Sequence, residues 1–232
     1  MRKIRTFYHY FSPTERLLWG CSALLILLSF LIFDRSNTLT LWASLIGVSS
    51  LIFTAKGNPI GQLLMVVFSL LYGVISWQFR YYGEMLTYLG MTMPMALFAL
   101  ITWLKHPYKG NRAQVAVDRL RPGEPVFLCL LTAAVTGLFY FVLTYFHTAN
   151  LPLSTLSVTT SFAAVYLTFR RSPLYALAYA ANDVVLILLW LLASLHSSHY
   201  FSVVICFCAF LVNDLYGFFC WRSMEKRQRA QD

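Results

Sequence analysis

Charged side chains are scarce in this sequence. Only 12% of its 232 residues are charged, whereas 59% are hydrophobic. A soluble domain carries about 25% charged residues, so this composition excludes one and indicates a polytopic membrane protein. A net charge of +9 would suggest a nucleic-acid partner in a soluble protein. Here the basic residues lie between apolar segments, where membrane topology explains them, and we expect no nucleic-acid binding.

Motifs for metals, disulfide frameworks and nucleotides are missing from the sequence. The five cysteines form no CxxC pair and lie in apolar segments, as expected of small core residues. The sequence also contains no HExxH motif, no glycine-rich phosphate loop and no lysine in the middle of an apolar segment. We therefore expect no metal, no cofactor and no catalytic residue.

Eight apolar segments are each long enough to cross a bilayer as a helix, which takes about 20 residues. The first lacks a small-residue cleavage site and is predicted to be a retained helix. If the N-terminus is cytoplasmic, sixteen of the eighteen Lys and Arg residues fall inside and only Arg35 and Arg80 fall outside. This bias predicts that both termini are cytoplasmic. The segments lie at about 16–33, 38–55, 60–79, 82–104, 125–147, 151–169, 173–195 and 200–221.

A weak internal repeat indicates two three-helix units. Gly57-Asn58-Pro59 opens the third segment as Arg171-Ser172-Pro173 opens the seventh, and Trp103 closes the fourth as Trp221 closes the eighth. A unit of three spans begins on one side of the membrane and ends on the other, so one linking span is needed before a second unit can start from the same side. The two units are then parallel repeats, and such repeats place a substrate site between them near the midplane. We expect the loop at 105–124 to be a solvated joint without a site. The predicted parts are the N-terminus and an extra helix at 1–37, bundles at 38–104 and 151–221, a loop and linker helix at 105–150, and a basic cytoplasmic tail at 222–232.

Two Asn-Asp pairs lie well inside apolar segments, at Asn182-Asp183 and Asn213-Asp214. An intramembrane aspartate costs about 2.5–3.5 kcal/mol on insertion, whereas an interhelical hydrogen bond returns only about 0.6 kcal/mol. The aspartates, taken as the only full charges well inside the spans, are therefore expected to face a ligand cavity. The alternative is that both pairs hold the bundle together by bonding to one another or to Ser and Thr on neighbouring helices.

Aromatic rings share helix faces with these pairs. Tyr179 and Trp190 lie on the face of the first pair, and Tyr216 and Trp221 lie on one stripe with Asn213. Ring faces attract cations, and amides bond to hydroxyl or carboxamide groups, so the combination suits a flat, hydroxylated, cationic ligand. No Lys or Arg lies at mid-membrane, which disfavours a phosphorylated ligand.

Several segments carry a more specific pattern: YGEM at 82–85, MTMPM at 91–95 running to WLKHPYKGN at 103–111, AANDV at 180–184, and VNDLYGFFCWRSMEKRQ at 212–228. Together they resemble the PnuC family of nicotinamide riboside transporters, especially members from lactic-acid bacteria and streptococci. The resemblance implies a SWEET-like all-α fold, with an N-terminal helix and two parallel three-helix bundles joined by one helix. It also implies passive uptake of nicotinamide riboside through a bacterial cell membrane, trapping by cytoplasmic phosphorylation, and a homo-oligomer such as a trimer.

The resemblance also assigns site residues by motif: Asn182, Asp183, Asn213 and Tyr216 in the second unit, and Tyr88, Thr92 and Trp103 in the first. With the residues chosen from helix faces, the predicted substrate site comprises Asn182, Asp183, Asn213, Asp214, Tyr216, Tyr88, Thr92, Tyr179 and Trp190. Trp103 and Trp221 are the predicted gate.

Several alternatives stay open at this point. Ala96 stands where many family members have glutamine, and relatives of the family transport thiamine or riboflavin. The resemblance therefore identifies the family but leaves the transported vitamin open. Asp183 and Asp214 could instead be titrating carriers of a proton-coupled transporter. Two aspartates could also serve an intramembrane aspartyl enzyme. The last alternative is a non-transporting membrane scaffold.

Overall fold

The computed structural model describes residues 10–35, 37–78, 81–148 and 150–231. These ranges contain eight helices long and apolar enough to cross a membrane, which confirms the predicted spans. Their bounds agree to within a few residues except in the last span, whose helix continues to Arg229 through most of the predicted tail at 222–232. Arg2, Lys3, Arg5 and Arg80, which entered the topology prediction, lie outside the described residues. The spans are α2 (Pro13–Phe33), α3 (Thr38–Ala55), α4 (Ile60–Gln78), the run of α5 (Tyr82–Thr87), η1 (Tyr88–Thr92) and α6 (Met93–Lys105), α7 (Glu124–Tyr145), α8 (Leu151–Phe169), α9 (Tyr175–Ser194), and α10 (Phe201–Arg229), which the short η2 (Ser198–Tyr200) precedes.

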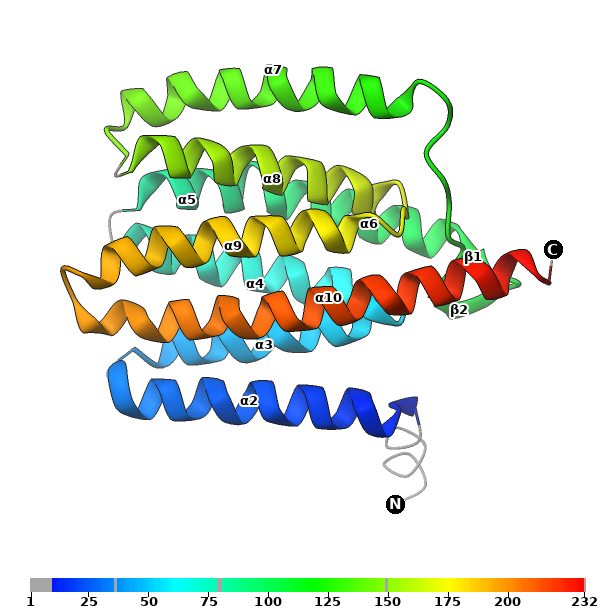
Figure 1. The fold of residues 1–232 in the computed structure, drawn as a ribbon, viewed down its shortest axis with the longest axis horizontal. Coiled ribbons are helices and arrows are strands. Elements are labelled where there is room, and N and C mark those ends of the chain that lie inside the picture. Colours follow the sequence, from blue (N-terminus) through cyan, green and yellow to red (C-terminus); the bar gives the residue numbers. More distant parts are fainter. Residues whose placement is uncertain (1–9, 36, 79–80, 149, 232) are drawn as a thin grey trace.

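The helices lie side by side with α2 and α7 at opposite edges (Figure 1). Helices α3, α4 and α6 pack as one group and α8, α9 and α10 as another, with α10 on α3 and α6 on α8 joining the two groups. Helix α2 covers α3 and α10, whereas α7 packs on α8. Below, the first bundle means α3 to α6 and the second bundle means α8 to α10.

Large apolar side chains cover the outside of this assembly. Ile32 of α2 and Phe141 of α7 are 68% and 72% exposed. The interior holds aliphatic side chains together with aromatic rings and many small polar residues. This arrangement suits a protein whose solvent is lipid, because apolar residues outside cost nothing there and polar groups must find partners inside.

The predicted repeat is visible in two matching turns. Gly57 follows α3 and Arg171 follows α8, both with positive φ, at 68° and 58°. Each donates its backbone N–H to the carbonyl three residues earlier, Gly57 to Thr54 at 2.8 Å and Arg171 to Thr168 at 3.0 Å. We call the side of the molecule with these turns the basic face, because Lys56 and Arg171 lie there.

The fourth span is not the single regular helix that the apolar run predicts. It contains a π-helical turn, η1, between α5 and α6. Pro94 lies near the start of α6, and a proline inside a helix lacks an N–H and clashes with the carbonyl four residues earlier. A wider turn just before the proline accommodates that clash, and such turns often mark functional sites.

The long loop is also more ordered than expected. Its strands β1 (Pro107–Tyr108) and β2 (Asn111–Val115) form an antiparallel hairpin. The two residues between them, Lys109 and Gly110, both have positive φ, as a tight hairpin turn requires. Val115 at the end of β2 is fully buried. The loop expected to be a solvated joint is exposed over most of the hairpin, but its end at Val115 packs into the core.

Candidate transport site

The two predicted gate residues meet at the basic face. The rings of Trp103 and Trp221 are fully buried and their centroids lie 5.3 Å apart. Trp103 of the first bundle donates its indole N–H to the carbonyl of Thr168 in the second, at 3.0 Å. Trp221 of the second bundle donates to the carbonyl of Thr54 in the first, at 2.8 Å. The pair thus joins the ends of the two bundles symmetrically, because each indole bonds to the other bundle.

Two tyrosines of α9 lead from the tryptophans towards the centre of the membrane. Tyr175 packs edge-on against Trp221, with ring centroids 4.9 Å apart. Tyr179 follows one turn later, 6.2 Å from Tyr175. The Tyr179 hydroxyl interacts with Thr168 and with the carboxyl of Asp214. These rings therefore connect the tryptophan pair to the buried aspartates.

The two aspartates face each other across α9 and α10. Asp183 and Asp214 are each only 3% exposed, and their carboxyl groups lie close enough to interact directly. Two neighbouring negative charges repel each other, so such a pair resists ionisation of both groups. The second oxygen of Asp183, Oδ2, has no hydrogen-bond partner among the described residues. The pair is therefore not a satisfied structural contact.

The two asparagines, in contrast, bond to neighbouring helices. Asn182 Oδ1 accepts hydrogen bonds from the hydroxyls of Thr160 and Ser161 on α8, both at 2.9 Å. Asn213 Nδ2 donates to Ser22 on α2 at 2.9 Å and to the carbonyl of Ala209 at 2.8 Å. For the amides, this geometry matches the alternative in which the polar pairs hold the bundle together.

The residues predicted to share one stripe of α10 point in two different directions. Tyr216 interacts with Ser12 and Glu15 at the start of α2, so it lies with Asn213 on the side that α2 covers. Asp214 turns to the carboxyl of Asp183 instead. Successive residues of a helix point about 100° apart, so adjacent residues such as an Asn-Asp pair cannot share one partner. The prediction that the polar pair and Tyr216 line one face is wrong for this reason.

A cluster of rings lies on the other side of the carboxyl pair, in the half of the membrane away from the basic face. Tyr72 and Tyr88 have ring centroids 4.3 Å apart, and Phe68 lies 5.9 Å from Tyr88. The Trp190 indole donates to the Tyr72 hydroxyl at 2.7 Å. Trp190 is seven residues, or about 10 Å of helix, beyond Asp183. The structure thus places Trp190 with the aromatic cluster and not beside the aspartates.

Glu84 is a buried carboxyl that the sequence interpretation missed. Its side chain is 1% exposed, and neither carboxyl oxygen has a hydrogen-bond partner of normal geometry among the described residues, although Ser157 lies nearby. It interacts electrostatically with Tyr72 and Tyr88. Glu84 lies near one end of its span, so the prediction about charges well inside the spans did not cover this third buried carboxyl.

The position of Glu84 near the start of the span explains why it was missed, because residues at span ends usually meet water. Here the end of the linker helix α7 covers the start of the span. The packing is so close that a Cβ added to Gly83, next to Glu84, would lie 2.6 Å from Thr148 and 2.9 Å from Leu143. The signal in the sequence was the helical spacing of Glu84 and Tyr88, one turn apart on one face. Tyr88 itself interacts electrostatically with both Glu84 and Asp183, and so connects the two bundles.

Thr92, the other predicted residue of the first bundle, ends the π-helical turn. It is 3% exposed and its hydroxyl has no hydrogen-bond partner among the described residues. The predicted residues that the structure brings together are therefore Tyr88, Tyr179, Asp183 and Asp214, and Glu84 joins them. Within the described ranges, no Lys or Arg side chain is buried in the core.

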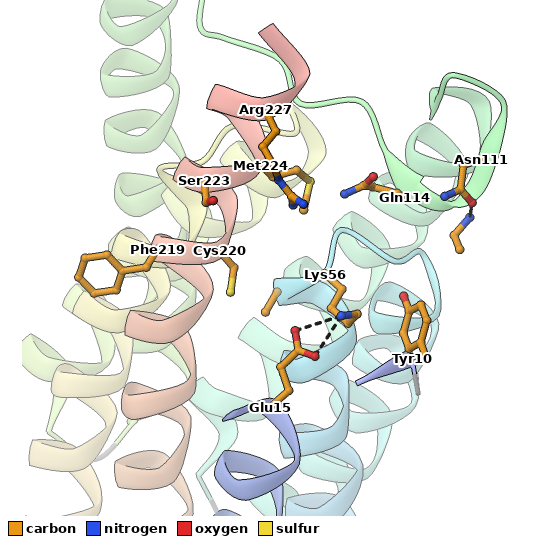
Figure 2. Close-up of a pocket in the computed structure, with 12 residues that line it drawn as sticks. Tyr10, Glu15, Lys56, Asn111, Gln114, Phe219, Cys220, Ser223, Met224 and Arg227 are labelled. Carbon is orange, nitrogen blue, oxygen red and sulfur yellow. Dashed lines mark hydrogen bonds and ion pairs between the residues drawn. The ribbon is translucent and has the colours of Figure 1, made fainter. Parts of the chain in front are cut away.

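A cavity of about 530 Å³ opens on the basic face, next to the end of α10 (Figure 2). Lys56 lies in it and binds both carboxylate oxygens of Glu15, at 3.1 and 3.0 Å. Arg227 of α10 and Gln114 of β2 line the same space. A volume of 300–1,000 Å³ is typical of small-molecule pockets. The charge of Lys56 is already neutralised by Glu15, so this lysine is not a free cation for a ligand. The lining of the cavity includes neither tryptophan of the predicted gate.

Comparisons with known proteins agree with this arrangement. The family model described as "Nicotinamide mononucleotide transporter" matches residues 37–223. A curated "Nicotinamide riboside transporter PnuC" from Neisseria mucosa is 24% identical over 206 residues, which cover 86% of this chain and 78% of the relative. The protein of that name from Haemophilus influenzae is 21% identical over 182 residues, covering 78% and 77%.

A solved structure described as "Crystal structure of the Vitamin B3 transporter PnuC" superimposes with a TM-score of 0.82. It is 21% identical and covers 94% of each chain, so the two share a fold. Because the matching family and curated relatives are transporters, the aspartyl-enzyme alternative is wrong. The chain is a multi-pass membrane transporter and belongs to the nicotinamide mononucleotide transporter family, as the resemblance to PnuC proteins predicted.

Proposed function

We propose that this protein takes up nicotinamide riboside by facilitated diffusion, with trapping of the riboside by phosphorylation in the cytoplasm. The observation that carries this proposal is the combination of buried carboxyl groups with buried rings and the absence, among the described core residues, of any buried Lys or Arg. The nicotinamide ring of the riboside is a flat cation, which carboxylates and ring faces attract. A mononucleotide would bring a phosphate with no cationic partner.

In this proposal the ring of the riboside lies between the aromatic cluster of the first bundle and the carboxyl pair of the second. Tyr88 is placed to contact the ring, because it neighbours both Glu84 and Asp183. Asp183 and Asp214 supply negative charge next to the cationic ring. The unpartnered oxygens of Glu84 and Asp183 accept the charge or the ribose hydroxyls.

The two bundles then rock about this site, with Trp103 and Trp221 as the gate on the basic face. Their indole bonds to the opposite bundle support that role, because both bonds break when the bundles separate. The double variant Trp103→Ala, Trp221→Ala is expected to leak or to lose transport. Unaltered transport in that variant would remove the gating role.

The location and assembly of the protein complete the proposal. The basic face and both termini lie in the cytoplasm of a bacterial cell, and the protein sits in the cell membrane in contact with lipid. The chain works as a homo-oligomer such as a trimer. Cysteine labelling from each side of the membrane tests the orientation, and native mass spectrometry of the purified protein tests the assembly.

Uptake into liposomes tests the function directly. Purified protein is reconstituted and given labelled nicotinamide riboside, its mononucleotide, thiamine or riboflavin. The proposal predicts that the riboside equilibrates and that the mononucleotide does not. Transport of thiamine or riboflavin without transport of nicotinamide riboside would assign the protein to a different vitamin.

A proton-coupled transporter is the second candidate, and the close approach of two buried carboxyl groups favours it. In this candidate one of Asp183 and Asp214 holds a proton, because two neighbouring negative charges repel each other, and exchanges it with the passing substrate. An imposed pH gradient would then drive accumulation above equilibrium, and Asp183→Asn would abolish the accumulation. Uptake that stops at equilibrium in the presence of the gradient favours facilitated diffusion.

A further inference from the structure

The segment Val115–Asp118, called the strap below, crosses the basic face between the two bundles. The Val115 N–H donates to the carbonyl of Gly57 at 2.9 Å, and the Asp118 N–H donates to the carbonyl of Arg171 at 3.1 Å. Gly57 and Arg171 occupy the matching turns after α3 and α8. The strap is therefore bonded to the same position of both bundles.

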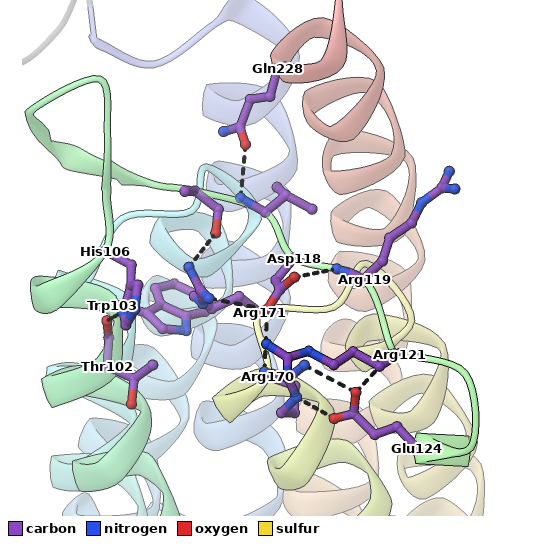
Figure 3. A network of polar contacts seen from close by, with 12 residues as sticks. Thr102, Trp103, His106, Asp118, Arg119, Arg121, Glu124, Arg170, Arg171 and Gln228 are labelled. Carbon is purple, nitrogen blue, oxygen red and sulfur yellow. Dashed lines mark hydrogen bonds and ion pairs between the residues drawn. The ribbon is translucent and has the colours of Figure 1, made fainter. Parts of the chain in front are cut away.

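Side chains of the second bundle hold the strap further. The Gln228 side chain on α10 accepts from the Val117 N–H at 2.8 Å and donates to the Val115 carbonyl at 3.0 Å. This amide thus pairs with the strap as a neighbouring strand would. Arg171 donates to the carbonyl of Ala116 at 3.1 Å. Figure 3 shows this network, with Gln228 and Arg171 on opposite sides of the strap.

Ion pairs also bind the strap to the second bundle. The Asp118 carboxylate binds Arg170 and Arg171, both at 3.2 Å, and Arg170 also binds Glu124. Burial lowers the pKa of the Arg171 guanidinium below its usual value, and the Asp118 carboxylate opposes that change. Asp118 is thus the counter-ion that keeps this partly buried cation in place.

The first bundle holds the strap less firmly. Its contacts are two backbone hydrogen bonds, from Val115 to Gly57 and from the Ala116 N–H to the carbonyl of His106 at 2.9 Å. No ion pair between the strap and the first bundle occurs within the described residues. The side chain of Val115 is fully buried and packs in one cluster with Trp103 and Trp221. The strap therefore covers the tryptophan pair on the basic face.

We infer that the strap is a latch that keeps this end of the transport path closed. Because it is bonded to equivalent turns of both bundles, the bundles cannot separate at the basic face while both sets of bonds persist. Opening releases the strap from Gly57, whereas Asp118, Arg171 and Gln228 keep it on the second bundle. This inference rests on the proposed movement of the two bundles against each other, but not on the identity of the substrate.

A reversible disulfide between the strap and the first bundle tests the latch. A Cβ on Gly57 would lie 3.4 Å from Cγ1 of Val115, so Gly57→Cys with Val115→Cys is close to disulfide distance. The substrate in this test is whichever of the four compounds from the liposome assay the reduced protein carries. With the disulfide formed, uptake is expected to fall roughly tenfold or more, and to recover on reduction, while binding from the opposite face persists. The two single variants, treated with the same oxidant, control for the five native cysteines.

Uptake that stays within roughly twofold of the reduced protein after complete cross-linking would overturn the latch. If the reduced protein carries nicotinamide riboside poorly but another vitamin well, the proposed substrate fails and the latch is still tested with that vitamin.

A second measurement needs no substrate and no cysteine. In Gln228→Ala, amide hydrogen exchange at residues 115–118 is expected to accelerate roughly tenfold or more, because the strap loses two of its bonds. Gln231→Ala is the matched control: Gln231 also contacts the hairpin, through the Tyr108 hydroxyl at 3.2 Å, but not the strap. Equal exchange in the wild type and both variants would show that the strap is not held as a latch and would overturn the inference.

Discussion

The basic face and the membrane-embedded centre of this protein satisfy their polar groups very differently. At the basic face the strap, Gln228 and the indoles of Trp103 and Trp221 each have defined hydrogen-bond partners, and the unpartnered buried atoms there, within the described ranges, are Arg171 Nε and the Thr54 hydroxyl. At the centre, Glu84 and Asp183 keep carboxyl oxygens without partners among the described residues. An unsatisfied buried polar group costs about 1–3 kcal/mol. The contrast separates groups that hold the fold from groups that are available to a ligand.

The same contrast divides the first Asn-Asp pair, whereas in the second pair Asn213 Oδ1 also has no hydrogen-bond partner among the described residues. The amides of Asn182 and Asn213 bond to α8 and α2, whereas the adjacent carboxyls face each other. The two bundles also differ less than their sequences indicate. Both Asn-Asp pairs lie in the second bundle, yet Glu84 gives the first bundle a buried carboxyl of its own.

The largest expected effect comes from neutralising the carboxyl pair. Asp183→Asn or Asp214→Asn should reduce riboside uptake by roughly a hundredfold, because the cation loses its counter-charge. The thermal unfolding midpoint should stay the same or rise, since no satisfied structural contact is removed. Asp118→Asn is the control, because that aspartate binds two arginines and should lower the unfolding midpoint. A loss of folding in the first two variants would instead identify the pair as structural.

Neutralising Glu84 should have a smaller effect of the same kind. Glu84→Gln keeps the shape of the side chain and is expected to lower uptake roughly tenfold, with no loss of thermal stability. Glu225→Gln is the matched control, because Glu225 forms ion pairs with Arg119, Arg222 and Arg229. Uptake that is unchanged in Glu84→Gln would remove Glu84 from the site.

The gate residues test whether the basic face is symmetric. Trp103→Phe and Trp221→Phe each remove one indole donor, while the carbonyls of Thr168 and Thr54 keep a backbone donor. Each variant should therefore lower the free energy of unfolding by about 0.5–1.5 kcal/mol. Measurements by thermal or denaturant unfolding in detergent should give similar values for both. A large difference between the two would mean that the matching bonds are not equivalent in energy.

The smallest expected effect concerns the tie between Asn213 and α2. Ser22→Ala removes the hydroxyl that accepts from Asn213 at 2.9 Å, and should cost about 0.6 kcal/mol of unfolding free energy. Uptake should stay within roughly twofold of the wild type, because the amide is not expected to contact the substrate. A strong loss of uptake would restore Asn213 to the transport site.

The spans were predictable because the bilayer dictates their length. Each apolar run has to cover about 30 Å of hydrocarbon, and all eight appear as helices. The repeat of proline-containing turns and tryptophans was also readable, since Pro59 and Pro173 mark helix starts and Trp103 and Trp221 mark helix ends. That spacing correctly indicated that the two tryptophans are equivalent, although not that each bonds to the other bundle.

The lining of the site was less predictable, because helix periodicity shows a face but not its neighbour. Asn213 and Tyr216 share a face that α2 covers, and only packing identifies α2 as the partner. Glu84 was missed because its burial depends on contact with Leu143 and Thr148 near the end of the linker helix. The strap was missed because its order comes from bonds to Gly57 and Gln228, which are far from it in sequence.

One binding measurement tests the central claim most directly, that buried carboxyls recognise the positive charge of an unphosphorylated riboside. Purified protein is titrated with nicotinamide riboside and with its dihydro form, which has nearly the same shape but a neutral ring. We predict that the cation binds roughly tenfold or more tightly, and that this preference disappears in Asp183→Asn. Equal affinity for both forms in the wild-type protein would contradict the claim.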